Sequence, residues 1–295
     1  FVFDDSNSRV ENWKTTVSIV NNSGVTFSNA TVRLISGAVL DGEGGAGLKF
    51  RSAAAPAMAD MQSESASVES VGDQKTYNLP GTVELVNGQS RQVVLFEGRD
   101  IDVVRTYFVP QFGGDNGKQE NVSVRLTVKN AESNNMGSER PAGPVKIYQY
   151  NAAGVQLQTG SAHISDKAKN EKFDMVIGTA SDIKYTRTLI SSKRFDAQGN
   201  ELVAAPRPNP TKGVRANPAP VAVEEPARQD DTYEVKVFNY KETRKVTVKV
   251  EVYLPNDQTV EKPLVQKNAR QAEGVITVNA ASNATLEYTI TTNLK

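Results

Sequence analysis

The sequence contains no cysteine and only one histidine among its 295 residues. The absence of cysteine excludes disulfides, thiolate metal ligands and a cysteine nucleophile. The single histidine, His163, can supply at most one ligand, which excludes a histidine-rich metal site. Nothing in the segment Ser161–Ser165 indicates a partner for a catalytic triad. We therefore interpret His163 as a surface residue, and expect no metal site, no cofactor and no catalytic residues.

Long apolar runs and an excess of charge of one sign are also missing. No run is long enough to cross a bilayer as a helix, and there is no signal-peptide pattern, so we expect any export signal or anchor to lie outside these residues. Lysine plus arginine number 34, and so do aspartate plus glutamate. A chain with zero net charge has no global field that would attract nucleic acid or an anionic membrane, and we expect neither as a partner.

The clearest structural pattern lies between Tyr233 and Val252. Tyr233, Val235 and Val237 alternate with polar residues, and after a polar interruption the alternation resumes through Val246–Val252. A period of two places the valines on one face of a strand and the charges on the other. This segment therefore predicts a half-buried antiparallel hairpin.

The same alternation recurs along the chain and predicts about a dozen strands. Val10–Val20, with Trp13 as a core anchor, and Thr31–Gly37 are predicted to form a first hairpin around the turn signal at Asn21–Gly24. Ile183–Ile190 is polar enough to predict an edge strand. Asn87-Gly88 and Asn151–Gly154 are predicted to form turns. The remaining predicted strands are Tyr77–Leu79, Thr82–Val86, Gln92–Phe96, Val103–Val109, Asn121–Asn130, Pro144–Tyr150, Val155–Leu157, Phe173–Gly178, Val275–Val278 and Thr285–Thr291.

Short strands, frequent turn signals and the absence of a long amphipathic pattern predict an all-β fold. We expect tandem antiparallel β-sandwich modules of immunoglobulin-like type with long loop insertions, in two domains at 1–168 and 169–295. The segment of about 52–72 lacks an apolar period and predicts a disordered or weakly helical insertion in the first domain. The proline-rich segment of about 204–226 predicts a surface excursion in the second, because proline cannot sit inside a sheet.

Two motifs suggest chemistry but fit a structural interpretation better. Gly42–Gly47 spells G-x-G-x-x-G, but the dinucleotide motif needs a following helix, and the residues after it alternate like a strand. We interpret it as a flexible loop. The acidic pairs lack the spacing of a calcium loop, although an incidental calcium site stays open. These pairs are Asp4–Asp5, Asp100-x-Asp102, Glu224–Glu225 and Asp230–Asp231.

Two further sets of side chains suggest ligand binding. A basic set could hold phosphate or an acidic glycan, but a solvated face that keeps a sheet edge soluble is the favoured interpretation. This set is Lys236, Lys241, Arg244, Lys245 and Lys249. A tyrosine set could form a platform for sugars, although tyrosine is also an ordinary strand residue. That set is Tyr148, Tyr150, Tyr233 and Tyr240.

The motifs along nearly the whole chain resemble a bacterial family. The segment Val17–Gly37, with Val20-Asn-Asn-Ser-Gly24 and Leu34-Ile-Ser-Gly37, resembles the uncharacterised domain that forms the C-terminal part of mucoidy-inhibitor-A-like proteins. Later blocks agree with it: Gly143-Pro-Val-x-Ile-Tyr148, Phe173-x-x-x-Ile-Gly178, Tyr233-x-Val-x-Val-x-Asn239 and Leu286-x-Tyr288. The resemblance implies an exported or envelope β protein without assigned activity, and a first domain incomplete at its N-terminus.

The expected function is accordingly a non-enzymatic module of the bacterial envelope or surface that binds a protein partner or self-assembles, with exposed edge strands as candidate contacts. We expect a periplasmic, outer-membrane-associated or extracellular location. The alternative is a carbohydrate-binding module for envelope or capsular polysaccharide. A hydrolase ranks third, because one histidine and no ordered nucleophile motif leave little to build it from. Fold analogy alone supports none of these strongly.

Overall fold

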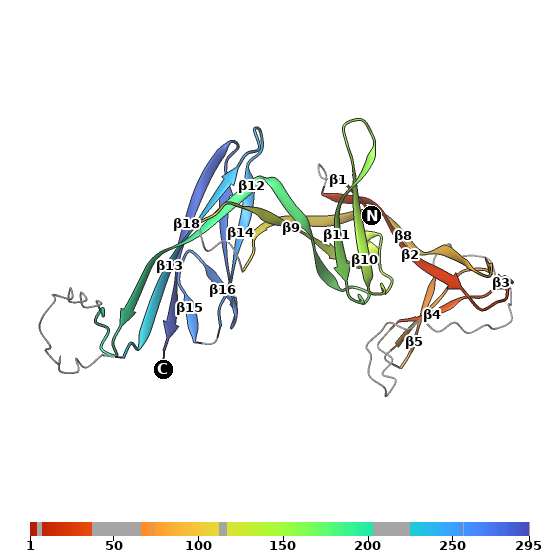
Figure 1. Ribbon diagram of the computed structural model, residues 1–295, viewed down its shortest axis with the longest axis horizontal. Coiled ribbons are helices and arrows are strands. Elements are labelled where there is room, and N and C mark those ends of the chain that lie inside the picture. Colours follow the sequence, from red (N-terminus) through yellow and green to blue (C-terminus); the bar gives the residue numbers. More distant parts are fainter. Residues whose placement is uncertain are drawn as a thin grey trace, which may run out of the picture. The chain divides into compact units, whose positions relative to one another are not determined.

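The chain is all-β in the computed structural model, which describes residues 1–4, 8–36, 66–72, 74–111, 117–202, 225–255 and 257–294 (Figure 1). Within those ranges the one helical segment is a single 3₁₀ turn, η1 (Glu132–Asn134). The strands form several sheets, as in a β-sandwich protein. The predicted all-β class is therefore confirmed. No helix of the described ranges is long and apolar enough to span a membrane.

The chain forms two compact units that are interleaved along the sequence. The first comprises residues 1–105 and 125–178, and the second comprises 106–124 and 179–295. The three long strands β8 (Gln89–Val109), β9 (Glu120–Lys129) and β12 (Lys172–Phe195) each contribute residues to both units. The domains expected from the sequence, 1–168 and 169–295, differ from these units in two segments. Residues 106–124 were expected in the first domain but belong to the second unit, and residues 169–178 were expected in the second domain but belong to the first unit.

The main sheet of the first unit is built around the N-terminal strand. Its order is β11 (Gln156–Ile164), β10 (Gly143–Tyr150), β1 (Val2–Asp4), β2 (Arg9–Asn21) and β8. Strand β1 pairs parallel to β10 and antiparallel to β2. Alternate residues of these strands and of β9 and β12 pack into one apolar cluster, and Trp13 is 3% exposed within it, as predicted. Its buried members are Phe3, Val10, Trp13, Ile101, Val103, Leu126, Val128, Val145, Ile147, Ile164, Phe173 and Met175.

A second, smaller core in the same unit is built from short strands. Strand β6 (Gln74–Asn78) pairs with β4 (Arg33–Ser36) and β5 (Ser67–Val71), while β3 (Phe27–Ala30) pairs with β7 (Val83–Leu85). These strands cover the far ends of β2 and β8, with Val17 and Val93 packed against the cluster. Its buried members are Val32, Leu34, Ala66, Tyr77, Leu79, Leu95 and Phe96.

This arrangement corrects two expectations. The predicted first hairpin is wrong, because β2 pairs with β8 and β4 pairs with β6. The apolar pattern identified both strands, but the turn after Asn21 leads into β3 instead of back along β2. The predicted insertion at 52–72 ends earlier than expected, since Ser67–Val71 is strand β5, hydrogen-bonded to β6.

The second unit contains two sets of paired strands. One runs in the order β12, β13 (Arg228–Asn239), β18 (Ser282–Asn293) and β15 (Gln258–Val260), with β13 and β18 in register over their whole length. In the other, β14 (Val246–Tyr253) pairs with β17 (Gln271–Val278) and, in parallel, with the end of β8. Strand β16 (Val265–Asn268) pairs with the outer edge of β17.

The hairpin predicted across Tyr233–Val252 is therefore wrong in its pairing, although both of its strands exist. Strand β13 pairs with β12 and β18, and β14 pairs with β17 and β8. The predicted edge strand at Ile183–Ile190 is also wrong, because β12 lies between β9 and β13. The polar residues of this segment suggested an exposed edge, but Tyr185 and Arg187 are buried, with 1% and 3% of their surface exposed.

Three sequence predictions lie largely or wholly outside the described residues. These are the loop at Gly42–Gly47, the insertion up to residue 65, and the proline-rich segment up to residue 224.

Candidate interaction surfaces

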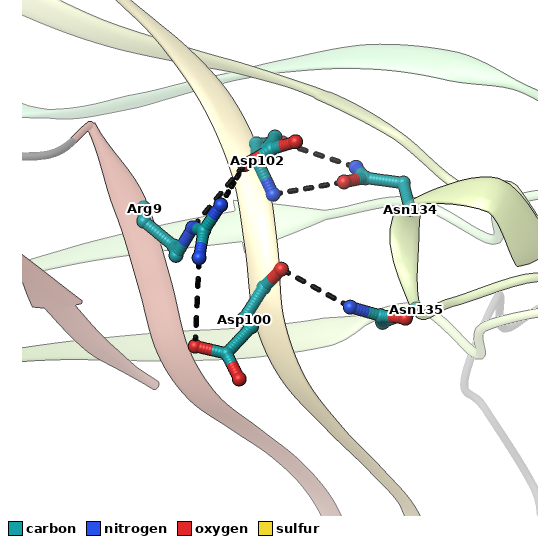
Figure 2. A network of polar contacts seen from close by, with 5 residues as sticks. All are labelled: Arg9, Asp100, Asp102, Asn134 and Asn135. Carbon is teal, nitrogen blue, oxygen red and sulfur yellow. Dashed lines mark hydrogen bonds and ion pairs between the residues drawn. The ribbon is translucent and has the colours of Figure 1, made fainter.

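The acidic pair Asp100-x-Asp102 lies in a network of polar contacts on β8 (Figure 2). The guanidinium of Arg9, on the neighbouring strand β2, donates through Nη2 to Asp102 Oδ1 over 3.1 Å and lies 3.8 Å from Asp100 Oδ1. Asn134, in η1, donates from Nδ2 to the Asp102 carbonyl oxygen and accepts the Asp102 backbone N–H at Oδ1 over 2.8 Å. Asn135 donates to the Asp100 carbonyl oxygen.

This network links η1 to β8, and its two carboxylates do not converge on a common point where a ligand could bind. Asn134 also donates to the Lys129 carbonyl oxygen, so one amide joins η1, β8 and the end of β9. Asp100 adopts φ = 53°, a left-handed conformation that aspartate tolerates better than most residues. Across the described residues, no three histidine, cysteine or acidic side chains come together as a metal site would require.

Asp230 and Asp231 are also held by neighbouring donors. Asp230 accepts a hydrogen bond from Thr291 Oγ1 over 2.9 Å and lies 3.2 Å from an Arg228 nitrogen. Asp231 accepts one from Ser192 Oγ over 2.6 Å. Asp5 and Glu224 lie outside the described residues.

The basic set does not form a free patch. Lys241 pairs with Asp182, and Lys249 lies 3.0 Å from Glu273, so both charges have local counterions. The Lys236 ammonium lies 5.4 Å from the centre of the Phe238 ring. Arg244 and Lys245 are exposed in the connection between β13 and β14.

The tyrosine set does not form one platform. Tyr148 and Tyr150 belong to the first unit, and Tyr233 and Tyr240 to the second. Tyr233 stacks on Tyr288, which is 4% exposed, and lies on the same face of β13 as the buried Val235. Tyr240 is 54% exposed on the opposite side of β13 and stacks with Phe238, with ring centroids 6.4 Å apart and planes 10° apart. This pair was not predicted, because Phe238 gave no signal of its own.

Strand β11 forms one edge of the main sheet of the first unit and makes a hairpin with β10 around the predicted turn at Asn151–Gly154 (Figure 1). Strand β11 ends the sheet and has nine residues. One of its faces is packed, since a Cβ on Gly160 would lie 2.2 Å from the Ile177 carbonyl oxygen. His163 lies on this strand, opposite Pro144, and is exposed, which agrees with the surface interpretation.

The hydrogen bonds of β10 show which backbone groups of β11 point outward. Tyr148 N–H donates to the Phe1 carbonyl oxygen over 2.9 Å, so it points toward β1 and away from β11. In an antiparallel ladder the N–H and C=O of one residue point the same way, and opposed residues alternate between bonded and non-bonded pairs. Gln158 lies opposite Tyr148, and Gln156 lies opposite Tyr150. The backbone groups of both glutamines therefore point away from the sheet.

Strand β11 also lacks the devices that usually block a free edge. Native edges are protected by charge, proline, bulges or short length. Other strands that end sheets in the described structure have three to five residues, and several carry a charge: β4 has Arg33, β5 has Glu69 and β16 has Lys267. No charged residue or proline occurs between Gln149 and Ser165. One protection remains, because a bulge next to Gln158 interrupts the ladder with β10.

Comparisons with known proteins add no assignment. No model of a known protein family, no curated protein and no solved structure matches this chain. The resemblance to the mucoidy-inhibitor-A-like domain thus stays a prediction.

Proposed function

We propose that this chain is a non-enzymatic structural and protein-interaction module of a bacterial envelope or surface, built from tandem sandwich units of immunoglobulin-like type. The single observation that carries the proposal is the edge of β11, nine residues long and free of charge and proline. Such an edge accepts a further strand through main-chain hydrogen bonds. The bacterial envelope location is supported by the family resemblance of the sequence.

A site-specific cross-link tests this role. A photo-reactive side chain placed at Gln158, whose backbone faces outward, is expected to trap one defined protein species in cells of the source organism. The same group at Val275, 54% exposed on β17, serves as the matched control. Equal, diffuse labelling from both positions would remove β11 as a docking edge and with it the basis of the proposal.

Carbohydrate binding is a second candidate, favoured by the Phe238–Tyr240 pair. Two parallel rings offer apolar faces for the C–H side of a sugar ring, and Gln119 lies beside the Tyr240 hydroxyl, with Nε2 3.3 Å from it. Titration calorimetry with envelope polysaccharide is expected to give binding that Tyr240→Ala abolishes and Tyr150→Ala leaves intact. Tyr150 is a fair control because its exposed fraction, 55%, is almost the same. Equal loss in both variants would count against this site.

A further inference from the structure

We propose that the strand added to β11 is β11 of a second copy of this chain, paired antiparallel about a two-fold axis at Leu157. This inference rests on the proposed function and names its partner. It starts from the outward direction of the backbone groups at Gln156 and Gln158 and from the exposed apolar side chains of the β10–β11 hairpin.

The register follows from the direction of these backbone groups. Residues that both point toward a new strand form the hydrogen-bonded pairs of an antiparallel ladder. Gln156 of one copy then pairs with Gln158 of the other, and the two-fold axis repeats that pair. Leu157 faces Leu157 of the second copy in the narrow, non-hydrogen-bonded position, where Cα atoms lie about 4.5 Å apart. A shift by one residue would bring inward-pointing backbone groups to the interface. Among the registers that keep outward groups paired, the axis at Leu157 is the one that sets the exposed Leu157 side chains against each other.

The composition of the hairpin favours a second copy over a charged partner. An isologous contact places the same residues on both sides, so any charge at its centre would face itself. Residues 149–165 include no aspartate, glutamate, lysine or arginine, and the glutamine amides both donate and accept. A partner recognised through opposite charge would find no charge here to match.

The exposed apolar side chains of the hairpin are the second argument. Leu157, on the proposed axis, is 49% exposed; Val155, two residues along the chain, and Tyr150, opposite Gln156 on β10, are 53% and 55% exposed. Pairing would set Leu157 against its counterpart in the second copy and remove apolar surface from water. The bulge after Gln158 limits the straight run of the edge, and an isologous contact about a two-fold axis uses the β11 edge of both copies, so assembly through this edge closes at a dimer.

A single cysteine gives the most direct test, because the chain has none of its own. In the full chain, Leu157→Cys is expected to form a disulfide-linked dimer under mild oxidation, since facing Cα atoms at about 4.5 Å lie within the range that disulfides bridge. Val104→Cys, with the native residue 62% exposed on β8, is the control and is expected to stay monomeric under the same conditions. Equal cross-linking of both variants, or none from either, would overturn the proposed axis.

Sedimentation velocity over a concentration series supplies an independent measurement. The unmodified chain is expected to show a monomer–dimer equilibrium. Leu157→Lys, which places two ammonium groups opposite each other, is expected to raise the dimer dissociation constant by roughly tenfold or more. Val275→Lys introduces the same charge at a site of similar exposure and is expected to leave that constant unchanged.

The outcomes separate this inference from the broader function. A chain that stays monomeric at all concentrations, but whose Gln158 photo-cross-linker traps a different protein, would refute self-pairing and keep the interaction role. A monomer with no specific cross-link from Gln158 would refute both.

Discussion

The guanidinium carbon of Arg140 lies 4.9 Å from the centre of the Phe96 ring, and the arginine is 3% exposed. Its Nη1 donates to Thr15 Oγ1 over 3.1 Å. Among the described residues no carboxylate forms an ion pair with it. Phe96 belongs to the smaller core of the first unit, so a buried cation lies against that core without an acidic counterion. Burial lowers the pKa of Arg140 to about 10.

Replacing Arg140 by alanine is expected to destabilise the first unit by about 2–3 kcal/mol. The change removes a cation–π contact, a hydrogen bond to Thr15 and the packing of the aliphatic stem. Urea unfolding followed by fluorescence measures the loss. Arg99→Ala is the matched control: its side chain is 73% exposed, paired only with Glu97, and is expected to change stability by less than about 0.5 kcal/mol. Equal effects would show that the buried guanidinium contributes nothing special.

Alkaline pH is expected to destabilise the protein through Tyr77. Burial, with Asp166 and Glu139 nearby, raises the pKa of the Tyr77 hydroxyl above its usual 10.0. The folded chain then keeps a proton that the unfolded chain releases, so stability present below pH 10 is lost as the pH rises beyond it. Arg140 acts in the opposite direction between about pH 10 and 12.5, because there the unfolded chain binds the extra proton.

Absorbance titration of tyrosinate separates the two residues. Tyr77 of the native chain is expected to ionise only as the protein unfolds, and Tyr77→Phe is expected to remove one tyrosine from that late component. The difference in unfolding free energy between the native chain and Tyr77→Phe should shrink above pH 10. A difference that stays constant with pH would contradict the assignment.

Asn239→Asp is expected to cost about 2–4 kcal/mol in unfolding free energy at neutral pH. The Asn239 side chain is 1% exposed, and its Nδ2 donates to the carbonyl oxygens of Arg244 and Asn279 over 2.8 and 2.9 Å. A carboxylate cannot donate to these oxygens and would carry a buried charge. The loss should diminish at acidic pH, where the new carboxyl group is protonated. Asn283→Asp, at an exposed position on β18, is the control and should be nearly neutral.

In the network of Figure 2, the amide of Asn134 is expected to matter more than the ion pair. Asn134→Ala removes hydrogen bonds to backbone groups of β8 and β9, and we expect a loss of about 1–2 kcal/mol. Arg9→Ala removes an ion pair whose side chains are 46% and 77% exposed, with an expected loss below about 1 kcal/mol. Thermal unfolding of both variants decides the order, and a larger effect of Arg9→Ala would reverse it.

Sequence alternation identified individual strands well. Val246, Val248, Val250 and Val252 were predicted to share one face, and each is at most 4% exposed. The motif Tyr233-x-Val-x-Val-x-Asn239 likewise marks Val235, Val237 and Asn239 as buried. The alternation of buried and exposed residues is a property of a single strand, so it can be recognised without knowing which strand lies beside it.

A predicted turn set the strand pairing in one place and not in another. The turn at Asn151–Gly154 joins β10 to β11 as expected, whereas Asn87-Gly88 links β7 and β8, which pair with other strands. A pattern of burial shows which face of a strand is covered, but not which strand pairs with each of its edges. The sequence therefore could not predict the partners of β13, or that β8 and β12 are each one continuous strand. Identifying the candidate edge at Gln156–Gln158 required the directions of the backbone hydrogen bonds. The one signal of this edge in the sequence was the uncharged stretch 149–165.

Because β8, β9 and β12 each supply residues to both units, the chain passes between them three times. A gene fragment cut at any single point would encode one unit without some of its strands, together with strands that belong to the other unit. Recombination by a single crossover therefore could not move either unit into another protein intact. Expression fragments should therefore keep both units together.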